Sequence, residues 1–353
     1  MSVKEFRADN VRCLEQVRLE PARNNFIFGE NASGKTSLLE ALFILGRGRS
    51  FRRAARDTII RDQSDSMTVA ATLQQRGMEK RIGIGLSRTD PPRIRVDGRD
   101  ENSAASLAEW MPVQVIDPDV HDLIAEGPSV RRRFLDWGLF HVEPLFLDTW
   151  RRYQRVMKQR NAALRLPGGD LQPWDEQLVA EGEKLNCMRA SYSEALAGVL
   201  KEIGASLLHG MPTMTYRRGW PEGKTLATAL TEARERDRRY GVSHVGPHRA
   251  ELTISVEERS AKGRVSRGQQ KMLAAALLIA QAVHLKNTAS VDTILLLDDL
   301  PAELDVTSLD RLLAVIRPLA AQVFMTSLER RDFNLDGPTQ VFHVEQGKVR
   351  SVL

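Results

Sequence analysis

The sequence predicts an α/β fold into which a mainly helical second lobe is inserted. A glycine-rich loop lies between an apolar strand and a helix near the N-terminus, and an apolar strand ends in two carboxylates near the C-terminus. Between these features the apolar residues follow helical spacing and arginine is frequent. We therefore expect residues 1–115 and 290–353 to form the α/β lobe and residues 116–289 to form the mainly helical lobe.

Composition favours a globular protein of the cytoplasm. Of the 353 residues, 42% are hydrophobic and 27% are charged, which is enough apolar surface to bury a large core. The net charge of +5 permits a nucleic-acid partner without requiring one. Cys13 and Cys187 have no metal-type spacing, which suits a reducing compartment. The run Met272 to Val283 is too short to cross a membrane, so we expect a buried helix there and no membrane partner.

The glycine-rich loop fits the pattern Gly-x-x-x-x-Gly-Lys-[Ser/Thr], with the apolar strand Phe26–Phe28 before it and helix-forming residues after it. Backbone N–H groups in such a loop point at phosphate oxygens, and the positive end of the helix dipole faces the same way. Lys35 would reach the β- and γ-phosphates of ATP, and the Thr36 hydroxyl would bind Mg²⁺. A simple glycine turn before a surface helix is the alternative interpretation. The candidate binding residues are Gly29, Glu30, Asn31, Ala32, Ser33, Gly34, Lys35, Thr36 and Ser37.

The first third of the chain is predicted to be rich in strands. Residues 1–28 alternate apolar and polar positions, which fits two short strands before the loop. Residues 66–100 show the same alternation and contain the turn signal Asp97-Gly98, so an antiparallel meander is expected. A further strand is predicted at Val113–Ile116.

Basic segments leave two interpretations open. The loop Gly46–Arg53 could lie near nucleotide or DNA phosphates, or it could be a solvated loop. From Leu123 to Arg239 the pattern is mostly helical, and arginines there could be solvated helix faces or contacts to DNA phosphates. His248 could be structural, or it could act as a switch or phosphate contact. The arginines concerned are Arg131, Arg132, Arg133, Arg151, Arg152, Arg155, Arg160, Arg234, Arg236, Arg238 and Arg239.

Two further motifs complete the candidate site. The strand Thr293–Asp299 is a nearly continuous apolar run that ends in two carboxylates, as expected for a strand buried on both faces. Asp298 would hold Mg²⁺ with Thr36, and Asp299 would act as general base, so that Lys35 and Asp299 are the candidate catalytic residues. An exposed turn at the strand end is the alternative. A second anion site is predicted at the start of the apolar helix that precedes this strand, at Ser266, Arg267, Gly268, Gln269 and Gln270.

Together the three motifs resemble the ATP-binding-cassette (ABC-type) ATPase head, and the chain resembles the bacterial RecF family of recombination mediators within that superfamily. The resemblance extends over nearly the whole chain. The residues that carry it are 29–37, 46–51, 117–119, 127–128, 131–136, 246–249, 266–270 and 296–305.

The resemblance implies an ATP-dependent homodimer. In such proteins the signature motif of one subunit, which corresponds here to Ser266–Gln270, closes on the γ-phosphate held by the other subunit. Asp305 would then lie near the nucleotide and the interface. It also implies weak, DNA-stimulated ATP hydrolysis and binding to double-stranded DNA and to gapped or single-stranded junctions. RecR and RecO would be partners, in recombinase loading, replication restart and the SOS response.

Some positions depart from the superfamily pattern. Asp299 stands where a glutamate is usual, and its shorter side chain fits slow turnover. Thr326 occupies the place where transporters carry a switch histidine, and Asp117 or Asp119 is the candidate to replace the usual Q-loop glutamine. Two other classes of function remain open: a phosphotransferase built on the same loop, and a scaffold for replication proteins that does not hydrolyse ATP.

Overall fold

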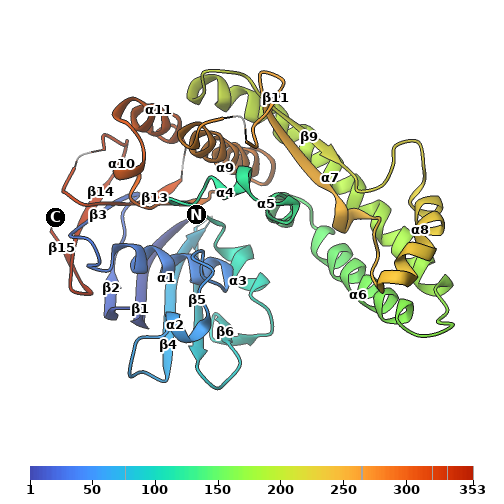
Figure 1. The fold of residues 1–353 in the computed structure, drawn as a ribbon. Helices are drawn as coiled ribbons and strands as arrows, with labels where there is room; N and C mark the ends of the chain where they lie inside the picture. Colours follow the sequence, from blue (N-terminus) through green and yellow to red (C-terminus); the bar gives the residue numbers. More distant parts are fainter. Residues whose placement is uncertain (76, 264, 320, 332, 353) are drawn as a thin grey trace. The chain divides into compact units, whose positions relative to one another are not determined.

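The chain divides into two compact units, described separately below. The computed structural model describes residues 1–75, 77–263, 265–319, 321–331 and 333–352. One unit comprises Met1–Val120 and Leu285–Leu353, and the other comprises His121–His284 (Figure 1). These divisions fall a few residues from the boundaries at 115/116 and 289/290 that the sequence suggests.

The first unit contains an antiparallel sheet with strand order β2-β1-β4-β5-β6-β7. Its hairpin between β6 and β7 turns at Asp97 and Gly98, whose φ angles of 48° and 80° are those that a tight hairpin needs. The meander predicted for residues 66–100 is therefore confirmed. The strands are β1 (Ser2–Val11), β2 (Leu14–Leu19), β4 (Ser66–Gln75), β5 (Met78–Ser87), β6 (Arg93–Val96) and β7 (Arg99–Glu101).

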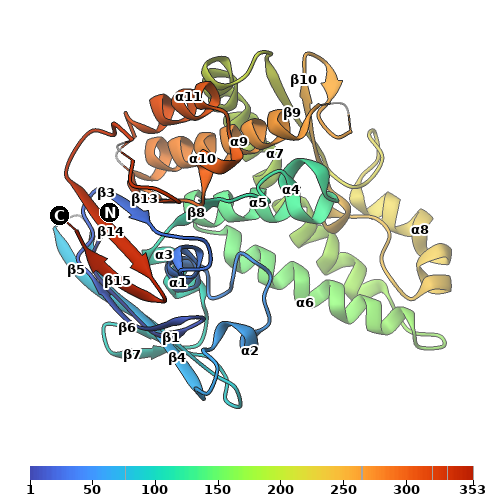
Figure 2. The same ribbon diagram turned by 60° about the vertical axis from the view of Figure 1, so that its left-hand side comes forward.

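The second sheet of this unit has the order β15-β14-β3-β13-β12-β8 (Figure 2). Strands β14, β3, β13, β12 and β8 are parallel to their neighbours, and β15 pairs antiparallel with β14. Every residue of β12 is buried, as the unbroken apolar run predicts. The strands are β3 (Asn24–Phe28), β8 (Val113–Ile116), β12 (Ile294–Leu297), β13 (Gln322–Ser327), β14 (Thr339–Glu345) and β15 (Lys348–Ser351).

Helix α1 (Lys35–Arg47) packs against side chains of both sheets, and this fixes the position of the loop that precedes it. One hydrophobic cluster joins Phe6 and Ile84 of the antiparallel sheet, Leu42 of α1 and Phe324 of the parallel sheet. A helix that is apolar around its whole circumference is stable only when it is enclosed in this way. The shorter helices of the unit are α2 (Arg56–Ile59), α3 (Ala105–Trp110), α10 (Leu300–Glu303) and α11 (Val306–Ile316).

The second unit is mainly helical, as predicted, and contains a small antiparallel sheet of order β11-β10-β9. The stretch 123–239 is mostly helical, as the sequence predicts, and the strand β9 is the exception within it. Threonines alternate with Met214 and Tyr216 in β9, a pattern that suits a strand paired with β10. The elements are α4 (Asp122–Ala125), α5 (Pro128–Val142), α6 (Phe146–Leu164), α7 (Gln172–Leu207), α8 (Leu226–Tyr240), β9 (Pro212–Arg217), β10 (Glu251–Val256), β11 (Arg259–Ser260) and the short 3-10 helix Pro247–Arg249.

Helix α9 (Arg267–Ala289) is the one helix within the described residues that is long and apolar enough to cross a membrane. Of its most apolar window, 61% is buried inside the fold, and Leu277, Ile279 and Ala280 have no exposed surface. This degree of burial is typical of a core helix, which agrees with the buried helix predicted from Met272 to Val283.

Candidate functional site

The loop between β3 and α1 has a backbone that depends on its glycines. Gly29 and Gly34 have φ angles of 156° and 119°, in the range that residues with a Cβ rarely adopt. A Cβ on Gly29 would lie 2.1 Å from the carbonyl oxygen of Val344, so glycine is required there for space as well. Ala32, at 62°, holds a left-handed conformation without being glycine.

This loop presents unpaired polar groups at the start of α1. Gly34 precedes the helix without a side-chain cap, so the first N–H groups of α1 remain available to an anion. The Ser33 hydroxyl is buried and has no hydrogen-bond partner among the described residues. The Lys35 ammonium donates to the carbonyl oxygens of Gly29 and Glu30 at 2.7 and 2.8 Å. Burial lowers the Lys35 pKa, while the charges of Asp299 and Asp298 oppose that shift.

The two carboxylates follow β12 directly, and the structure brings the first of them to the loop. Asp298 is 4% exposed, and its Oδ1 accepts hydrogen bonds from the hydroxyls of Thr36 at 3.1 Å and Thr326 at 2.8 Å. Burial raises the Asp298 pKa, these two hydrogen bonds lower it, and the neighbouring charge of Asp299 raises it again. Asp299 is half-buried and left-handed, with φ 51° and ψ 34°.

The donor set at this point fits a hard divalent cation. Carboxylate and hydroxyl oxygens are the ligands that Mg²⁺ prefers, and Thr36 and Asp298 supply one of each within hydrogen-bond distance. The parallel pairing of β8 with β12 places Asp117 just beyond Ile116, whose carbonyl accepts from the Asp298 amide at 2.9 Å. Asp117 thus lies at the same sheet edge as the two carboxylates.

Two contacts, one to the loop and one to α1, were not predicted from the sequence. The amide of Gly347, between β14 and β15, donates to the Ser33 carbonyl at 2.8 Å, so the C-terminal hairpin holds the loop from outside. Glu40 of α1 is fully buried and accepts from both Arg12 nitrogens Nε and Nη2 at 2.9 Å, and from the Ser50 hydroxyl. A lone glutamate within an apolar helix needs such partners, and that signal could have indicated a buried ion pair.

The basic loop Gly46–Arg53 is anchored to the core. Ser50 binds Glu40, and the Phe51 ring packs edge-on against Phe43 with their centroids 5.4 Å apart. Arg52 is exposed, and its positive charge lowers the pKa of Asp298. Ser50 and Phe51 fix the loop against α1, and the interpretation as a loop near nucleotide or DNA phosphates stays a prediction.

The signature residues begin α9. The Ser266 hydroxyl accepts from the Gln269 amide at 3.3 Å, and the Gln269 side chain accepts from the Ser266 amide at 3.0 Å, which is a capping box. Gln270 is buried and donates to the carbonyl of Val265 at 3.2 Å. A Cβ on Gly268 would meet nothing within 4 Å. These residues belong to the second unit, whereas the loop Gly29–Ser37 and the two carboxylates belong to the first.

Asp305, in the first unit, caps α11. Its Oδ1 accepts from the Ser308 amide at 2.9 Å and its Oδ2 from the Ser308 hydroxyl at 2.6 Å. These hydrogen bonds lower the Asp305 pKa, so the carboxylate is charged and exposed. The role near the nucleotide stays a prediction.

His248 is a structural residue in this structure. Its Nε2 lies 2.9 Å from the Ser243 carbonyl, which can only accept, so Nδ1 accepts from the Tyr153 hydroxyl at 2.7 Å. Burial lowers the His248 pKa to about 4. The interpretation of His248 as a phosphate contact is therefore disfavoured, because the ring is neutral and both nitrogens are engaged.

Two of the arginines considered for DNA are buried in ion pairs. Arg131 binds Glu251 with two hydrogen bonds of 2.8 and 2.9 Å, and Arg160 binds Asp175 at 2.6 Å and Asp237 at 2.8 Å. Neither is available to a nucleic acid. The exposed members of the set are Arg133, Arg151, Arg152, Arg155, Arg234, Arg236, Arg238 and Arg239.

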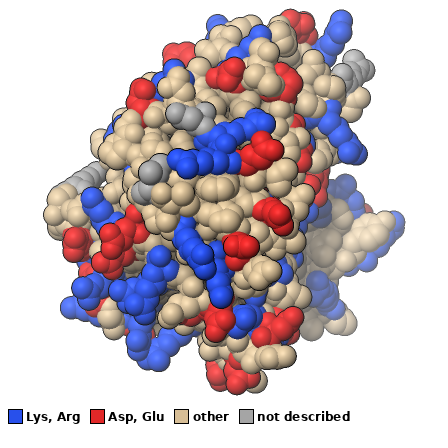
Figure 3. Space-filling view, turned by 90° about the vertical axis from the view of Figure 1, so that its left-hand side faces the viewer, with Lys and Arg blue, Asp and Glu red and all other residues tan. Residues whose placement is uncertain are grey.

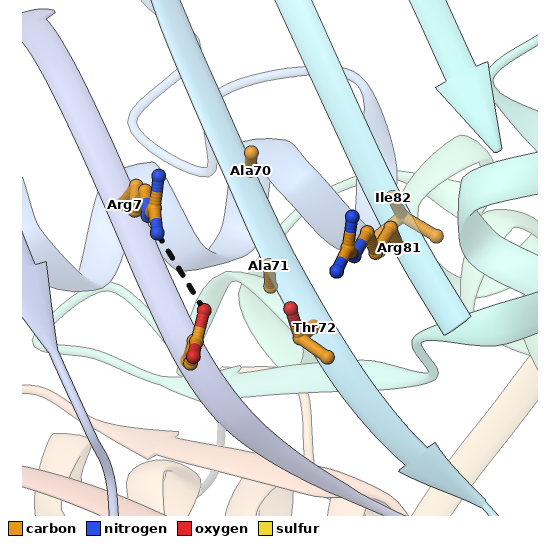
Figure 4. Close-up of a pocket in the computed structure, with 7 residues that line it drawn as sticks. Arg7, Ala70, Ala71, Thr72, Arg81 and Ile82 are labelled. Atoms are coloured by element: carbon orange, nitrogen blue, oxygen red, sulfur yellow. Dashed lines mark ion pairs between the residues drawn. The ribbon is translucent and has the colours of Figure 1, made fainter. Parts of the chain in front are cut away.

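A shallow hollow of about 240 Å³ lies on the outer face of the antiparallel sheet. Figure 4 shows Arg7 and Arg81 on the strands either side of Ala70 and Thr72. The register places Arg18 and Arg7 directly opposite one another, and Glu5, which also lines the hollow, forms an exposed ion pair with Arg7 at 3.7 Å. On the face that Figure 3 shows, basic and acidic side chains are interspersed.

Comparison with known proteins identifies the family. Residues 2–350 match the family model described as RecF/RecN/SMC N terminal domain. The chain is 38% identical to the DNA replication and repair protein RecF of Pseudomonas syringae pv. tomato, over 99% of this chain and 98% of the relative. Identity to the RecF of Pseudomonas aeruginosa is 40%, over 99% and 97%. The chain belongs to the RecF family.

Solved structures agree with this RecF assignment. The structure described as the recombination mediator protein RecF-ATP in the RecFOR pathway has a TM-score of 0.90, is 25% identical, and is matched over 97% of its chain and 99% of this one. An Smc head bound to a domain of ScpA has a TM-score of 0.62 at 15% identity, a likeness of fold alone. The predicted fold, an α/β head of the ABC type, is confirmed, and so is the resemblance to RecF.

Proposed function

We propose that this RecF-family protein binds ATP with Mg²⁺, hydrolyses it slowly, and acts in DNA replication and repair as the names of its relatives state. The observation that carries the proposal is the contact between Thr36 and Asp298, beside a loop that offers unpaired N–H groups and the Ser33 hydroxyl. Oxygen ligands for a cation and donors for phosphate thus meet at one edge of a parallel sheet, where α/β proteins bind their ligands.

Each residue has a distinct part in this proposal. The loop amides and Lys35 would hold the phosphates, and Thr36 and Asp298 would hold Mg²⁺, which neutralises phosphate charge when bound. Asp299 would orient the attacking water and accept its proton. Because aspartate is shorter than the usual glutamate, its carboxylate reaches less far, and we expect slow turnover.

We also propose that ATP joins two copies of the chain. The start of α9 supports this, because Ser266, Arg267, Gly268 and Gln269 are exposed there and Gly268 has open space around it. Two copies of the chain that are joined through one triphosphate would separate when hydrolysis removes the γ-phosphate. Asp305 and the signature residues would contribute to the composite site.

The test compares two variants by analytical ultracentrifugation and by binding of a fluorescent ATP analogue. Lys35→Met should abolish both nucleotide binding and ATP-dependent dimerisation. Ser266→Arg should block dimerisation and leave nucleotide binding within about twofold, because it alters only the surface offered to the partner. Equal loss of nucleotide binding and dimerisation in Ser266→Arg would contradict the composite site. Nucleotide binding by Lys35→Met that equals that of the unaltered protein would contradict the assignment of the loop.

DNA is proposed as the macromolecular partner, with duplex, gapped and single-stranded junctions as candidate structures. A row of directly paired outer-face positions supports it: Arg18, Arg7, Ala70, Gly83 and Arg95. Small residues at the centre allow a backbone to approach, and phosphates would replace the exposed carboxylates of Glu5 and Asp100 that now pair with Arg7 and Arg95. By family membership we further propose partnership with RecR and RecO, a cytoplasmic location, and roles in recombinase loading, replication restart and the SOS response.

The DNA surface is tested with paired charge losses. Arg7→Gln with Arg18→Gln should weaken DNA binding and reduce the slope of log K against log salt by about two, one for each phosphate that is no longer neutralised. Arg236→Gln with Arg239→Gln removes the same charge from exposed positions on α8. An equal effect of both pairs would show that net charge, not the sheet face, sets the DNA affinity.

The family match over the whole chain disfavours a phosphotransferase. DNA binding that is insensitive to salt and independent of ATP would favour the alternative of a replication scaffold that does not hydrolyse ATP.

A further inference from the structure

Thr326 connects the two carboxylates of the site through one hydroxyl. It is the fifth residue of β13 and has no exposed surface. Its Oγ1 donates to Asp298 Oδ1 at 2.8 Å and accepts from the backbone amide of Asp299 at 2.8 Å. A side chain of one acid and the backbone of the next are therefore held by the same atom.

The direction of these hydrogen bonds is fixed by chemistry. The Asp299 amide can only donate, so it occupies a lone pair of the Thr326 oxygen. The Thr326 proton is then directed to Asp298, the acceptor that lies within reach. A hydroxyl held on both sides in this way cannot turn to donate to a third group without breaking a bond in a buried place, which is costly.

Each of the two bonds acts on a different feature of the site. Asp299 is left-handed, a conformation that aspartate adopts more readily than most residues with a Cβ, and the hydrogen bond to Thr326 fixes the amide of that residue. Asp298 Oδ1 receives both Thr326 and Thr36, and no hydrogen bond reaches Oδ2 within the described part of the chain. The carboxylate is thus turned with one oxygen toward its donors and the other unpaired.

We propose that Thr326 is a positioning residue, which orients the Asp298 carboxylate toward a divalent cation and fixes the backbone from which Asp299 projects. It holds the two acids and makes no contact with the γ-phosphate, unlike the switch histidine that transporters carry at this place. The proposal rests on the proposed ATP hydrolysis, because it assigns the acids their roles in that reaction.

The experiment compares Thr326→Val, which keeps the shape and removes the hydroxyl, with Thr326→Ser, which keeps the hydroxyl. In Thr326→Val we expect kcat for ATP to fall about 10- to 100-fold, as is typical when a partner of a metal ligand is removed. The KM should stay within about twofold. The Mg²⁺ concentration that half-saturates binding of a fluorescent ATP analogue should rise several-fold. Thr326→Ser should resemble the unaltered protein in all three.

Three results would overturn the proposal. Thr326→Val could match the unaltered protein, Thr326→Ser could be as impaired as Thr326→Val, or Thr326→Val could raise KM at constant kcat, which would indicate a contact to nucleotide. If the valine variant does not fold, amide hydrogen exchange of the unaltered protein decides. The Asp299 amide must then be protected, and exchange at the rate of an exposed amide would refute the hydrogen bond.

Failure of the proposed function has a different signature. It would show as absence of Mg²⁺-dependent hydrolysis in the unaltered protein, whatever residue stands at position 326. If the Asp299 amide is protected from exchange in that case, the hydrogen bond to Thr326 is still supported. If the amide is not protected, the inference about Thr326 fails as well.

Discussion

Two buried aspartates, Asp298 in the first unit and Asp237 in the second, show how a ligand site differs from a structural ion pair. Asp237 is fully buried, and both of its oxygens are occupied by protein donors. Oδ2 accepts from Arg160 at 2.8 Å, and Oδ1 accepts from the amide and the ring of His244 at 3.0 and 2.8 Å. Asp298 is nearly as buried, but both of its donors share Oδ1.

The charged groups around the two aspartates also differ. Arg160, itself fully buried, faces Asp237, so the pair is neutral within the protein. Asp298 has another carboxylate beside it, the charges of Lys35 and Arg52 offset it in part, and its pKa is raised mainly by burial. A buried carboxylate with hydroxyl donors and an acidic neighbour is suited to a cation, and one that faces a buried arginine is already complete.

The largest expected effect is the loss of Asp237. Replacing it by asparagine leaves Arg160 without its fully buried counter-charge, and unfolding by urea should show a loss of about 3–5 kcal/mol. Nucleotide affinity of the folded protein should not change. The matched control is Asp175→Asn, because Asp175 also binds Arg160 but is 14% exposed and should cost less. A loss under about 1 kcal/mol in Asp237→Asn would mean that the pair contributes little to stability.

Asp298→Asn should behave in the opposite way. The amide oxygen can still accept from Thr36 and Thr326, and a charge that is costly to bury disappears, so the free energy of unfolding should change by less than about 1 kcal/mol. The Mg²⁺-dependent affinity for ATP should fall about 100-fold or more, because the carboxylate is the charged ligand. Titration of a fluorescent ATP analogue with and without Mg²⁺ measures this. Retained Mg²⁺ dependence would contradict the metal assignment.

The sequence predicts the first unit's site better than the second unit's contacts, for a physical reason. The loop Gly29–Ser37 and the strand before Asp298 are local patterns, in which backbone conformation and spacing are set by adjacent residues. Their meeting follows from the pairing of parallel strands, so the juxtaposition of Thr36 with Asp298 could be expected.

Other contacts depend on residues far apart in the chain and could not be predicted. Nothing near Ser33 in the sequence indicates that Gly347 holds it, and nothing near Arg160 distinguishes it from the exposed Arg155 except helical phase. The alternatives for His248 remained open for the same reason, since the Tyr153 hydroxyl that binds it is 95 residues away.

The smallest expected effect is a dependence of stability on pH that comes from His248. Its pKa is about 4 in the folded protein and about 6.5 when unfolded, so below pH 6.5 the unfolded chain binds the additional proton. Stability is therefore fully present above about pH 6.5 and declines as the pH falls toward 4. Between about pH 7 and pH 5.5 this amounts to roughly 1 kcal/mol.

Urea unfolding of His248→Gln at these two pH values isolates that contribution. Glutamine does not titrate, so the stability difference between the two pH values should shrink by roughly 1 kcal/mol, whatever the variant costs overall. If His248→Gln keeps the full pH dependence, the histidine titrates alike in both states. That result would contradict the buried, doubly hydrogen-bonded environment described for the His248 ring.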